Sequence, residues 1–202
     1  MSDAGRKALK IPEGTYLHFM SFGLQCFGEI LGVIRRSADL VQLASSLQFV
    51  GNSQQVNGDA LFVQADGCYS KLPTVDAWPE SRDAGLYDGN LPVVAHPPCS
   101  RWSRLARFCE VRHGLKVGAD GGCFEAALKA VRANGGVIEH PAFSKAWAHY
   151  GLPRPETKHH GWTAGTCGGY SCYIEQGRYG HPVKKATWLY VFGVPKNKLP
   201  EL

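Results

Sequence analysis

A strand–helix–strand pattern in the middle of the chain places the strongest limit on its fold. The segment "LPVVAH" (91–96) is almost wholly apolar, and "CFEAALKAVRANGG" (123–136) carries apolar residues at helical spacing before an Asn-Gly stop. A second apolar segment, "GVIEHP" (136–141), follows at once and ends at a proline. Such apolar strands are typical of parallel sheets that are buried on both faces. The pattern predicts an α/β domain in which these two strands are parallel neighbours joined by a helical crossover.

Three further segments are expected to be strands because they are short, apolar and bounded by turn residues. They are "ALFVQAD" (60–66), "YSCYIEQGRYG" (170–180) and "KATWLYVFG" (185–193). The last two are expected to pair antiparallel through a turn around His181-Pro182, whereas the earlier strands are expected to be parallel. The sequence thus predicts a mostly parallel sheet with antiparallel strands at its C-terminal end.

The N-terminal region differs from the rest of the chain in its pattern of apolar residues. Apolar residues between Phe27 and Phe49 recur at helical spacing and predict one helix, and "GNSQQVNGD" (51–59) has the composition of a linker. We therefore expect residues 1–57 to form an N-terminal extension and residues 58–202 to form an α/β catalytic domain.

Polar clusters follow three of the predicted strands. They are Pro97-Pro98-Cys99, Glu139-His140-Pro141 and Gln176-Gly177-Arg178. Ligands bind beyond the carboxyl ends of strands in open α/β sheets, so Cys99 and Glu139 are expected to face one crevice from adjacent strands. Two prolines fix two backbone φ angles directly before Cys99, which favours a thiol that must be held in one place.

The three clusters, taken with their order and spacing, resemble the motifs of a known enzyme family. "PPCSRWS", "EHP" and "QGRYG" stand about forty residues apart, and they are similar to the Pro-Pro-Cys, Glu-Asn-Val and Gln-x-Arg-x-Arg motifs of the cytosine-C5 DNA methyltransferases. The resemblance covers about residues 91–191. It implies a partial Rossmann-like methyltransferase fold. The stretches "ALFVQADGCYSKLPTVDAW" and "KKATWLY" also look like uncharacterised phage and prophage proteins.

The resemblance implies a role for each matching residue. The Cys99 thiolate would add to C6 of the pyrimidine, Glu139 would bind the base and act as the acid, and Arg178 would stabilise the negative charge. This set is chemically coherent, because C5 of a pyrimidine becomes nucleophilic only after a group adds at C6. The neighbouring motif positions are expected to contact the substrate: Pro97, Pro98, Ser103, His140, Gln176, Tyr179 and His181.

The resemblance implies S-adenosylmethionine as the cofactor, but the glycine-rich loop that cradles this donor is not recognisable upstream of Cys99. Asp66, at the end of a predicted strand, is a candidate for contacting the cofactor ribose. His140 stands where the family has asparagine, and Gly180 replaces the second arginine of the last motif. The expected partners are DNA or a pyrimidine nucleotide, and a partner subunit that supplies target recognition or the cofactor site.

Two other functions compete with this interpretation. One is a non-catalytic module that binds nucleic acid or a protein partner and keeps a degenerate methyltransferase half-fold. The other is a zinc-stabilised domain, suggested by Cys167 and Cys172 with His159 and His160 before them. Histidines 96, 140 and 181 and Cys99 also flank the expected crevice. The five-residue separation of the two cysteines departs from the usual zinc-knuckle spacing, so no residue is assigned to a metal.

Charge and cysteine content limit where such a chain would work. The formal net charge is +5, and residues 1–60 contribute none of it because they hold five basic and five acidic side chains. A basic α/β region is compatible with a phosphate-bearing partner. The chain shows no apolar run near the roughly 20 residues of a membrane helix. The seven cysteines are dispersed and odd in number, which favours reduced thiols and a cytoplasmic location.

Overall fold

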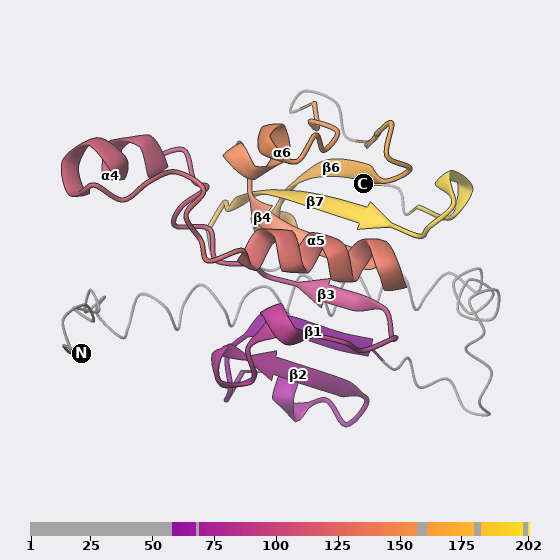
Figure 1. Ribbon diagram of the computed structural model, residues 1–202. Coiled ribbons are helices and arrows are strands. Elements are labelled where there is room, and N and C mark those ends of the chain that lie inside the picture. The colour runs from indigo at the N-terminus through magenta and orange to yellow at the C-terminus, as the bar shows by residue number, and fades with distance from the viewer. Residues whose placement is uncertain (1–57, 68, 157–160, 180–182, 200–201) are drawn as a thin grey trace, which may run out of the picture.

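The computed structural model describes residues 58–67, 69–156, 161–179, 183–199 and 202, and these form one mixed sheet with helices packed on it (Figure 1). The predicted helix between Phe27 and Phe49 and the predicted turn at His181-Pro182 lie outside these residues. The strands are β1 (Gly58–Val63), β2 (Val75–Pro79), β3 (Val93–Ala95), β4 (Gly136–Pro141), β5 (Trp162–Ala164), β6 (Tyr170–Glu175) and β7 (Ala186–Phe192). The α-helices are α4 (Ala106–His113), α5 (Cys123–Asn134) and α6 (Lys145–His149). Short 3-10 turns are η1 (Tyr69–Lys71), η2 (Glu80–Arg82), η3 (Ala84–Leu86), η4 (Gln176–Tyr179) and η5 (Lys196–Lys198).

The strand order in the sheet is β2-β1-β3-β4-β7-β6-β5. Strands β2, β1, β3 and β4 are parallel, whereas β7 is antiparallel to both β4 and β6, and β5 is antiparallel to β6. The α/β class, the parallel pairing of β3 with β4 and the antiparallel pairing of β6 with β7 are therefore confirmed. The sequence did not predict β2 and β5. Both lie towards the edges of the sheet, where half-exposed residues replace the apolar run that marks a buried strand.

Helix α5 covers one face of the sheet beside β3 and β4 (Figure 1). Its predicted inner stripe of Phe124, Ala127, Leu128 and Val131 is buried. The helix is followed by Gly135 and by Gly136, which opens β4 with a φ of 134°. A Cβ at Gly136 would lie 1.9 Å from the carbonyl oxygen of Val93. Only glycine allows β3 and β4 to approach this closely, so this residue fixes the register of the two strands that lead into the candidate site.

Side chains of β4 alternate between the two faces of the sheet. Ile138 belongs to the hydrophobic cluster under α5, and the ring of His140 lies 5.2 Å from the ring of Phe124, also on α5. Val137 belongs to a separate cluster with Cys172 and Leu189. Because Glu139 is two residues from Val137, it points to the face opposite α5. The neighbouring residues Glu139 and His140 therefore serve different environments.

Candidate active site

The carboxyl end of β3 lies beside Glu139 of β4. Ala95, the last residue of β3, pairs with Ile138, which brings the next residue along, His96, level with Glu139. The amide of His96 still donates to the carbonyl of Leu61 in β1, at 3.1 Å. Pro97 and Pro98 then end the pairing, because proline has no N–H to donate. The chain leaves the sheet here and carries Cys99 beyond the strand ends.

The loop that carries Cys99 is held by its own backbone. The carbonyl oxygen of Cys99 accepts from the amides of Trp102 and Ser103, at 3.0 and 2.9 Å. The indole of Trp102 is buried and donates to Asp120 at 2.7 Å, which ties the loop to the start of α5. Pro97 is buried, and Pro98, Cys99 and Ser103 are half-buried. The loop thus presents the thiol from a rigid mount with partial access to solvent.

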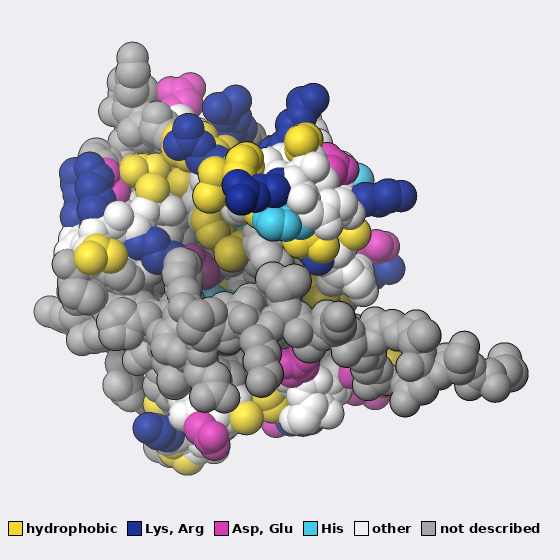
Figure 2. Space-filling model, turned by 90° about the vertical axis from the view of Figure 1, so that its left-hand side faces the viewer, with side chains coloured by type: hydrophobic (Ala, Val, Ile, Leu, Met, Phe, Trp, Pro, Cys, Tyr) yellow, Lys and Arg dark blue, Asp and Glu magenta, His cyan; other side chains and the backbone are white. Residues whose placement is uncertain are grey.

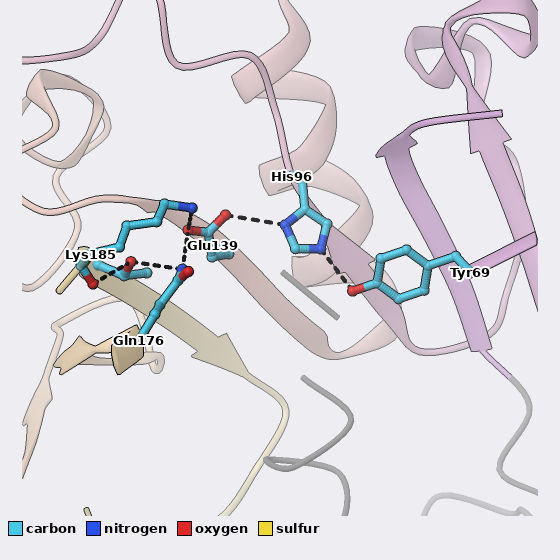
Figure 3. Close-up of polar contacts among 6 residues, drawn as sticks. Tyr69, His96, Glu139, Gln176 and Lys185 are labelled. Carbon is cyan, nitrogen blue, oxygen red and sulfur yellow. Dashed lines mark hydrogen bonds and ion pairs between the residues drawn. The ribbon is translucent and has the colours of Figure 1, made fainter. Parts of the chain in front are cut away.

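Glu139 is the centre of a polar network (Figure 3). Its Oε1 accepts from Nε2 of Gln176 at 3.1 Å and pairs with Nζ of Lys185 at 3.3 Å. Its Oε2 lies 3.2 Å from Nδ1 of His96, and Nε2 of the same ring lies 2.8 Å from the hydroxyl of Tyr69. Gln176 also donates to Thr187 at 2.9 Å. Three side chains therefore converge on the carboxylate of β4: Gln176 of η4, Lys185 before β7 and His96 after β3. Tyr69 of η1 joins the network through His96.

Glu139 is ionised in this setting. Burial raises the pKa of the carboxyl group, but the ammonium of Lys185, the hydrogen bond from His96 and the nearby rings of His96 and His140 together outweigh it. The result lowers the pKa of Glu139 to about 2. An ionised carboxylate only accepts hydrogen bonds, so Nδ1 of His96 must carry the proton of that contact.

The pKa of the Cys99 thiol depends on charged side chains of the same network. Burial raises the pKa of the thiol, the negative charge of Glu139 raises it further, and the ammonium of Lys185 opposes the increase. At rest the site holds a protonated thiol and an ionised carboxylate, rather than the thiolate and carboxylic acid that the addition step needs.

The structure places the other predicted residues in different surroundings. Gln176 is buried against Glu139, whereas Arg178 is 59% exposed and its Nε lies 3.7 Å from Oε2 of Glu175. Asp66 is exposed in the turn after β1. Tyr179 belongs to η4, but its side chain and the whole of His181 lie outside the described residues. The role assigned to Arg178 stays a prediction, and the cation that contacts Glu139 is Lys185.

His140 is fully buried on the α5 side of the sheet. Its Nδ1 lies 2.7 Å from the Ser144 hydroxyl, and its ring packs against Phe124 and Trp147. Burial lowers the pKa of His140 to about 4, although the charge of Glu139 and the backbone of Pro98 and Pro97 act in the opposite direction. These contacts give His140 a structural role beneath the Cys99 loop, and its predicted contact with substrate stays a prediction.

The burial of neutral His140 predicts acid sensitivity. The folded-state pKa is lowered from 6.5 to about 4, so its contribution to stability is present above pH 6.5 and lost as the pH falls through 4. This corresponds to roughly 3 kcal/mol of unfolding free energy. We expect His140→Phe, which keeps an aromatic ring, to show a much flatter stability profile between pH 7 and 4. Urea unfolding across this range measures it, and parallel profiles for the two proteins would contradict the prediction.

Sequence reasoning missed the functional contacts of Lys185, Thr187 and Tyr69, and considered His96 only for zinc. Lys185 directly precedes β7, and the antiparallel return from β6 brings it back beside Gln176, whose amide donates to the Lys185 carbonyl at 2.9 Å. The signal was present in the predicted hairpin, because a lysine at the start of its second strand must lie near the end of the first. Tyr69 carries no such signal, since residue type and spacing alone do not show that η1 folds back onto His96.

In the part of the chain that the structure describes, no three His, Cys, Asp or Glu side chains are arranged to hold a metal ion. These residues therefore add no support for the zinc alternative. Cys167 packs against the α5-side cluster, whereas Cys172 is buried in the cluster on the other face. His159 and His160 lie outside the described residues.

Comparisons of the chain with protein-family models, with curated proteins and with solved structures found no match. Of the helices formed by the described residues, none is long and apolar enough to cross a membrane.

Proposed function

We propose that this protein is a pyrimidine-modifying enzyme, similar in its chemistry to the cytosine-C5 DNA methyltransferases. In this proposal Cys99 adds to C6 of the base and Glu139 manages the protons. The observation that carries it is the topology: Cys99 follows β3 and Glu139 lies on β4, which are adjacent parallel strands. The negative charge of Glu139 also raises the pKa of the Cys99 thiol. A thiol and a carboxylate in one polar site are the groups that addition to a pyrimidine ring requires.

The strand order supports a Rossmann-like classification as part of this proposal. The strands β2, β1, β3 and β4 are parallel, and the strand order is built outwards from the central β1–β3 pair: β2 lies beside β1, and β4 lies beside β3. Doubly wound folds have the same reversal of order, and they bind ligands at the carboxyl ends of the strands that flank it. Strand β3 leads into Cys99 from that position.

The resting charges suggest how the addition step begins. As the Cys99 Sγ–C6 bond forms, the thiol loses its proton and the ring gains electron density. Glu139 is the nearby carboxylate that can accept this proton and pass it to N3 of the ring, so the proton given up by sulfur ends on the base. The ammonium of Lys185 remains beside the site and stabilises the negative charge that develops. No group outside the protein and the base is needed for this step.

A basic arm beside the site favours a nucleic acid as the substrate. Helix α4 projects away from the sheet (Figure 1), and the segment 101–116 around it holds five Lys and Arg side chains against one acidic side chain, Glu110. Figure 2 shows Lys and Arg gathered at this end of the molecule. Leu105, Phe108 and Val111 are exposed on the same segment. Positive charge interleaved with an exposed aromatic side chain is typical of surfaces that bind nucleic acid strands.

One observation favours the non-catalytic alternative. Cys99 is protonated at rest, and Glu139 is already engaged by Lys185, His96 and Gln176. A module that only binds nucleic acid would keep the arm and need no reactive thiol.

A covalent trap tests the proposed function. An oligonucleotide with 5-azacytosine is suitable, because the ring nitrogen at position 5 makes C6 more electrophilic and needs no donor. We expect the full chain to form an adduct whose intact mass equals protein plus oligonucleotide. Cys99→Ser should abolish the adduct, whereas Cys123→Ser, which changes a half-buried cysteine at the start of α5, should retain it. Binding of the oligonucleotide without any adduct would support the non-catalytic module instead.

A further inference from the structure

The turn after β4 holds Phe143 in an unusual backbone conformation. The amide of Ser144 donates to the carbonyl of Pro141 at 3.2 Å, and Phe143, the third residue of this turn, has a φ of 65°. Glycine or asparagine ordinarily takes such a position, because a bulky side chain is strained at positive φ. Strained residues of this kind cluster at active sites and ligand clamps. The ring of Phe143 is therefore a candidate for a role beyond packing.

The guanidinium group of Arg104 lies over this ring, with its central carbon 5.1 Å from the ring centroid. The ring of Trp188 lies 5.4 Å from the same ring. Trp188 is buried, Phe143 is half-buried and Arg104 is exposed, so the three side chains run from the core to the surface. Nucleobases stack on guanidinium planes as well as on aromatic rings. A base can therefore extend this series of side chains at its exposed end.

The Phe143–Arg104 pair is anchored to the loop that carries the thiol. The arginine directly follows Ser103, whose amide donates to the Cys99 carbonyl at 2.9 Å. On the other side, the amide of Lys145 donates to the Trp102 carbonyl at 2.8 Å and ties the turn after β4 to the same loop. A base stacked on this pair would therefore be a close neighbour, along one strand, of a base held at Cys99.

A second pair of the same kind lies farther out on the basic arm. Phe108 of α4 is 57% exposed, and the guanidinium carbon of Arg112 lies 5.7 Å from its ring centroid. Helices that bind membranes place basic and apolar side chains on opposite faces, whereas here the two kinds are in contact. This mixture favours a nucleic acid over a lipid surface. A duplex offers only the edges of its bases in the grooves, whereas a single strand offers the flat faces that stack on such pairs.

We propose that the Phe143–Arg104 and Phe108–Arg112 pairs are two stacking positions for the bases of a single-stranded nucleic acid, which brings the target base to Cys99. The inference rests on the proposed function for the chemistry at that base. The basic arm, with five basic side chains against one acidic, supplies contacts to the phosphates. A single strand also needs no base flipping, because its bases are already unpaired.

Fluorescence anisotropy tests the inference. The probes are fluorescein-labelled oligonucleotides of one mixed sequence, as single-stranded DNA, single-stranded RNA and duplex DNA, each titrated with the full chain. We expect a single strand to bind at least about tenfold tighter than the duplex, because only the strand gains stacking. The tighter of the two single strands identifies the natural one.

Substitutions separate stacking from charge. Phe108→Ala should weaken binding of the single strand about tenfold and leave the slope of log affinity against log salt unchanged, because a phenyl ring releases no counterions. Phe143→Leu keeps an apolar contact with Trp188 but offers no ring, so it should also weaken binding. Arg104→Gln should reduce the magnitude of the salt slope by about 0.7, the value for one phosphate contact on a single strand.

Two exposed residues away from the arm supply matched controls. Leu86 of η3 is 74% exposed and Lys129 of α5 is 76% exposed. Leu86→Ala removes an exposed apolar side chain, as Phe108→Ala does, and Lys129→Gln removes a positive charge, as Arg104→Gln does. Both control variants should bind the single strand with the affinity and the salt slope of the wild type.

The outcomes separate this inference from the proposed function. Equal affinity for single strand and duplex, or an affinity that Phe108→Ala leaves unchanged, overturns the inference. If the 5-azacytosine adduct then still forms on duplex DNA, the proposed function stands without it. Tight binding of a single strand that depends on both rings, with no adduct, overturns the proposed function and supports the two stacking positions. A dimer in sedimentation that Phe108→Ala disrupts, with no oligonucleotide bound, assigns the arm to a second copy of the chain and overturns the inference.

Discussion

Lys185→Met is expected to lower the free energy of unfolding at pH 7 by about 3–5 kcal/mol, the range found when one partner of a buried ion pair is removed. Lys185 and Glu139 are 17% and 14% exposed, and their Nζ and Oε1 atoms lie 3.3 Å apart. Methionine keeps most of the aliphatic length but leaves the buried carboxylate without its main counter-charge. Urea unfolding followed by tryptophan fluorescence measures the change.

The adjacent residue supplies a matched control. Lys184 is 72% exposed and pairs with Glu175, and exposed ion pairs add little to stability because solvent screens them. Lys184→Met should therefore leave the unfolding free energy nearly unchanged. The deficit of Lys185→Met should also shrink as the pH falls below 4.5, because loss of Lys185 raises the pKa of Glu139 and a protonated carboxyl group no longer needs a cation. Equal effects of the two substitutions would show that the Lys185–Glu139 contact is not a buried ion pair.

Most of the sheet could be predicted because its central strands are defined by local patterns. Strands β3 and β4 are apolar, the helix between them has a clear stripe, and Gly135-Gly136 ends that helix. The edge strands β2 and β5 were not predicted, because their half-exposed residues do not form the apolar run that marks a central strand. In β2, Asp76 is exposed and Pro79 donates no hydrogen bond, so the segment has the composition of a loop. Its place in the sheet depends on pairing with β1.

The candidate site was predictable only where it follows strand ends. Cys99 follows, and Glu139 lies within, apolar segments that had to be neighbours, so their placement at the same edge of the sheet follows from the topology. The positions of Lys185 and Tyr69 depend on how separate segments fold back: Lys185 reaches Glu139 through the β6–β7 return, and Tyr69 reaches His96 through η1. The resemblance directed attention to Arg178 of η4, which follows the first strand of that hairpin, whereas the cation that contacts Glu139 is Lys185, which directly precedes the second strand.

Glu139→Gln is expected to slow formation of the Cys99 adduct with 5-azacytosine by about 10²–10⁴-fold, the usual contribution of a general acid–base group. The amide has nearly the same shape and still offers an oxygen to Lys185 and Gln176, but it cannot take the thiol proton. The same change should make Cys99 more reactive towards iodoacetamide near pH 8. Glu139 raises the pKa of this thiol through its charge, so its removal increases the thiolate fraction.

The opposite directions of these two effects distinguish proton transfer from thiolate activation. If Glu139 only tuned the thiol, its loss would speed both reactions, and if it only supported the fold, its loss would not selectively speed alkylation. Rates of adduct formation and of Cys99 alkylation are measured by intact mass and by peptide mapping, with Cys99→Ser as the background. Glu175→Gln alters a carboxylate on β6 that pairs with Lys184, and both rates should stay at the wild-type value. An adduct rate in Glu139→Gln equal to that of the wild type would remove Glu139 from the chemistry and leave it only a structural charge.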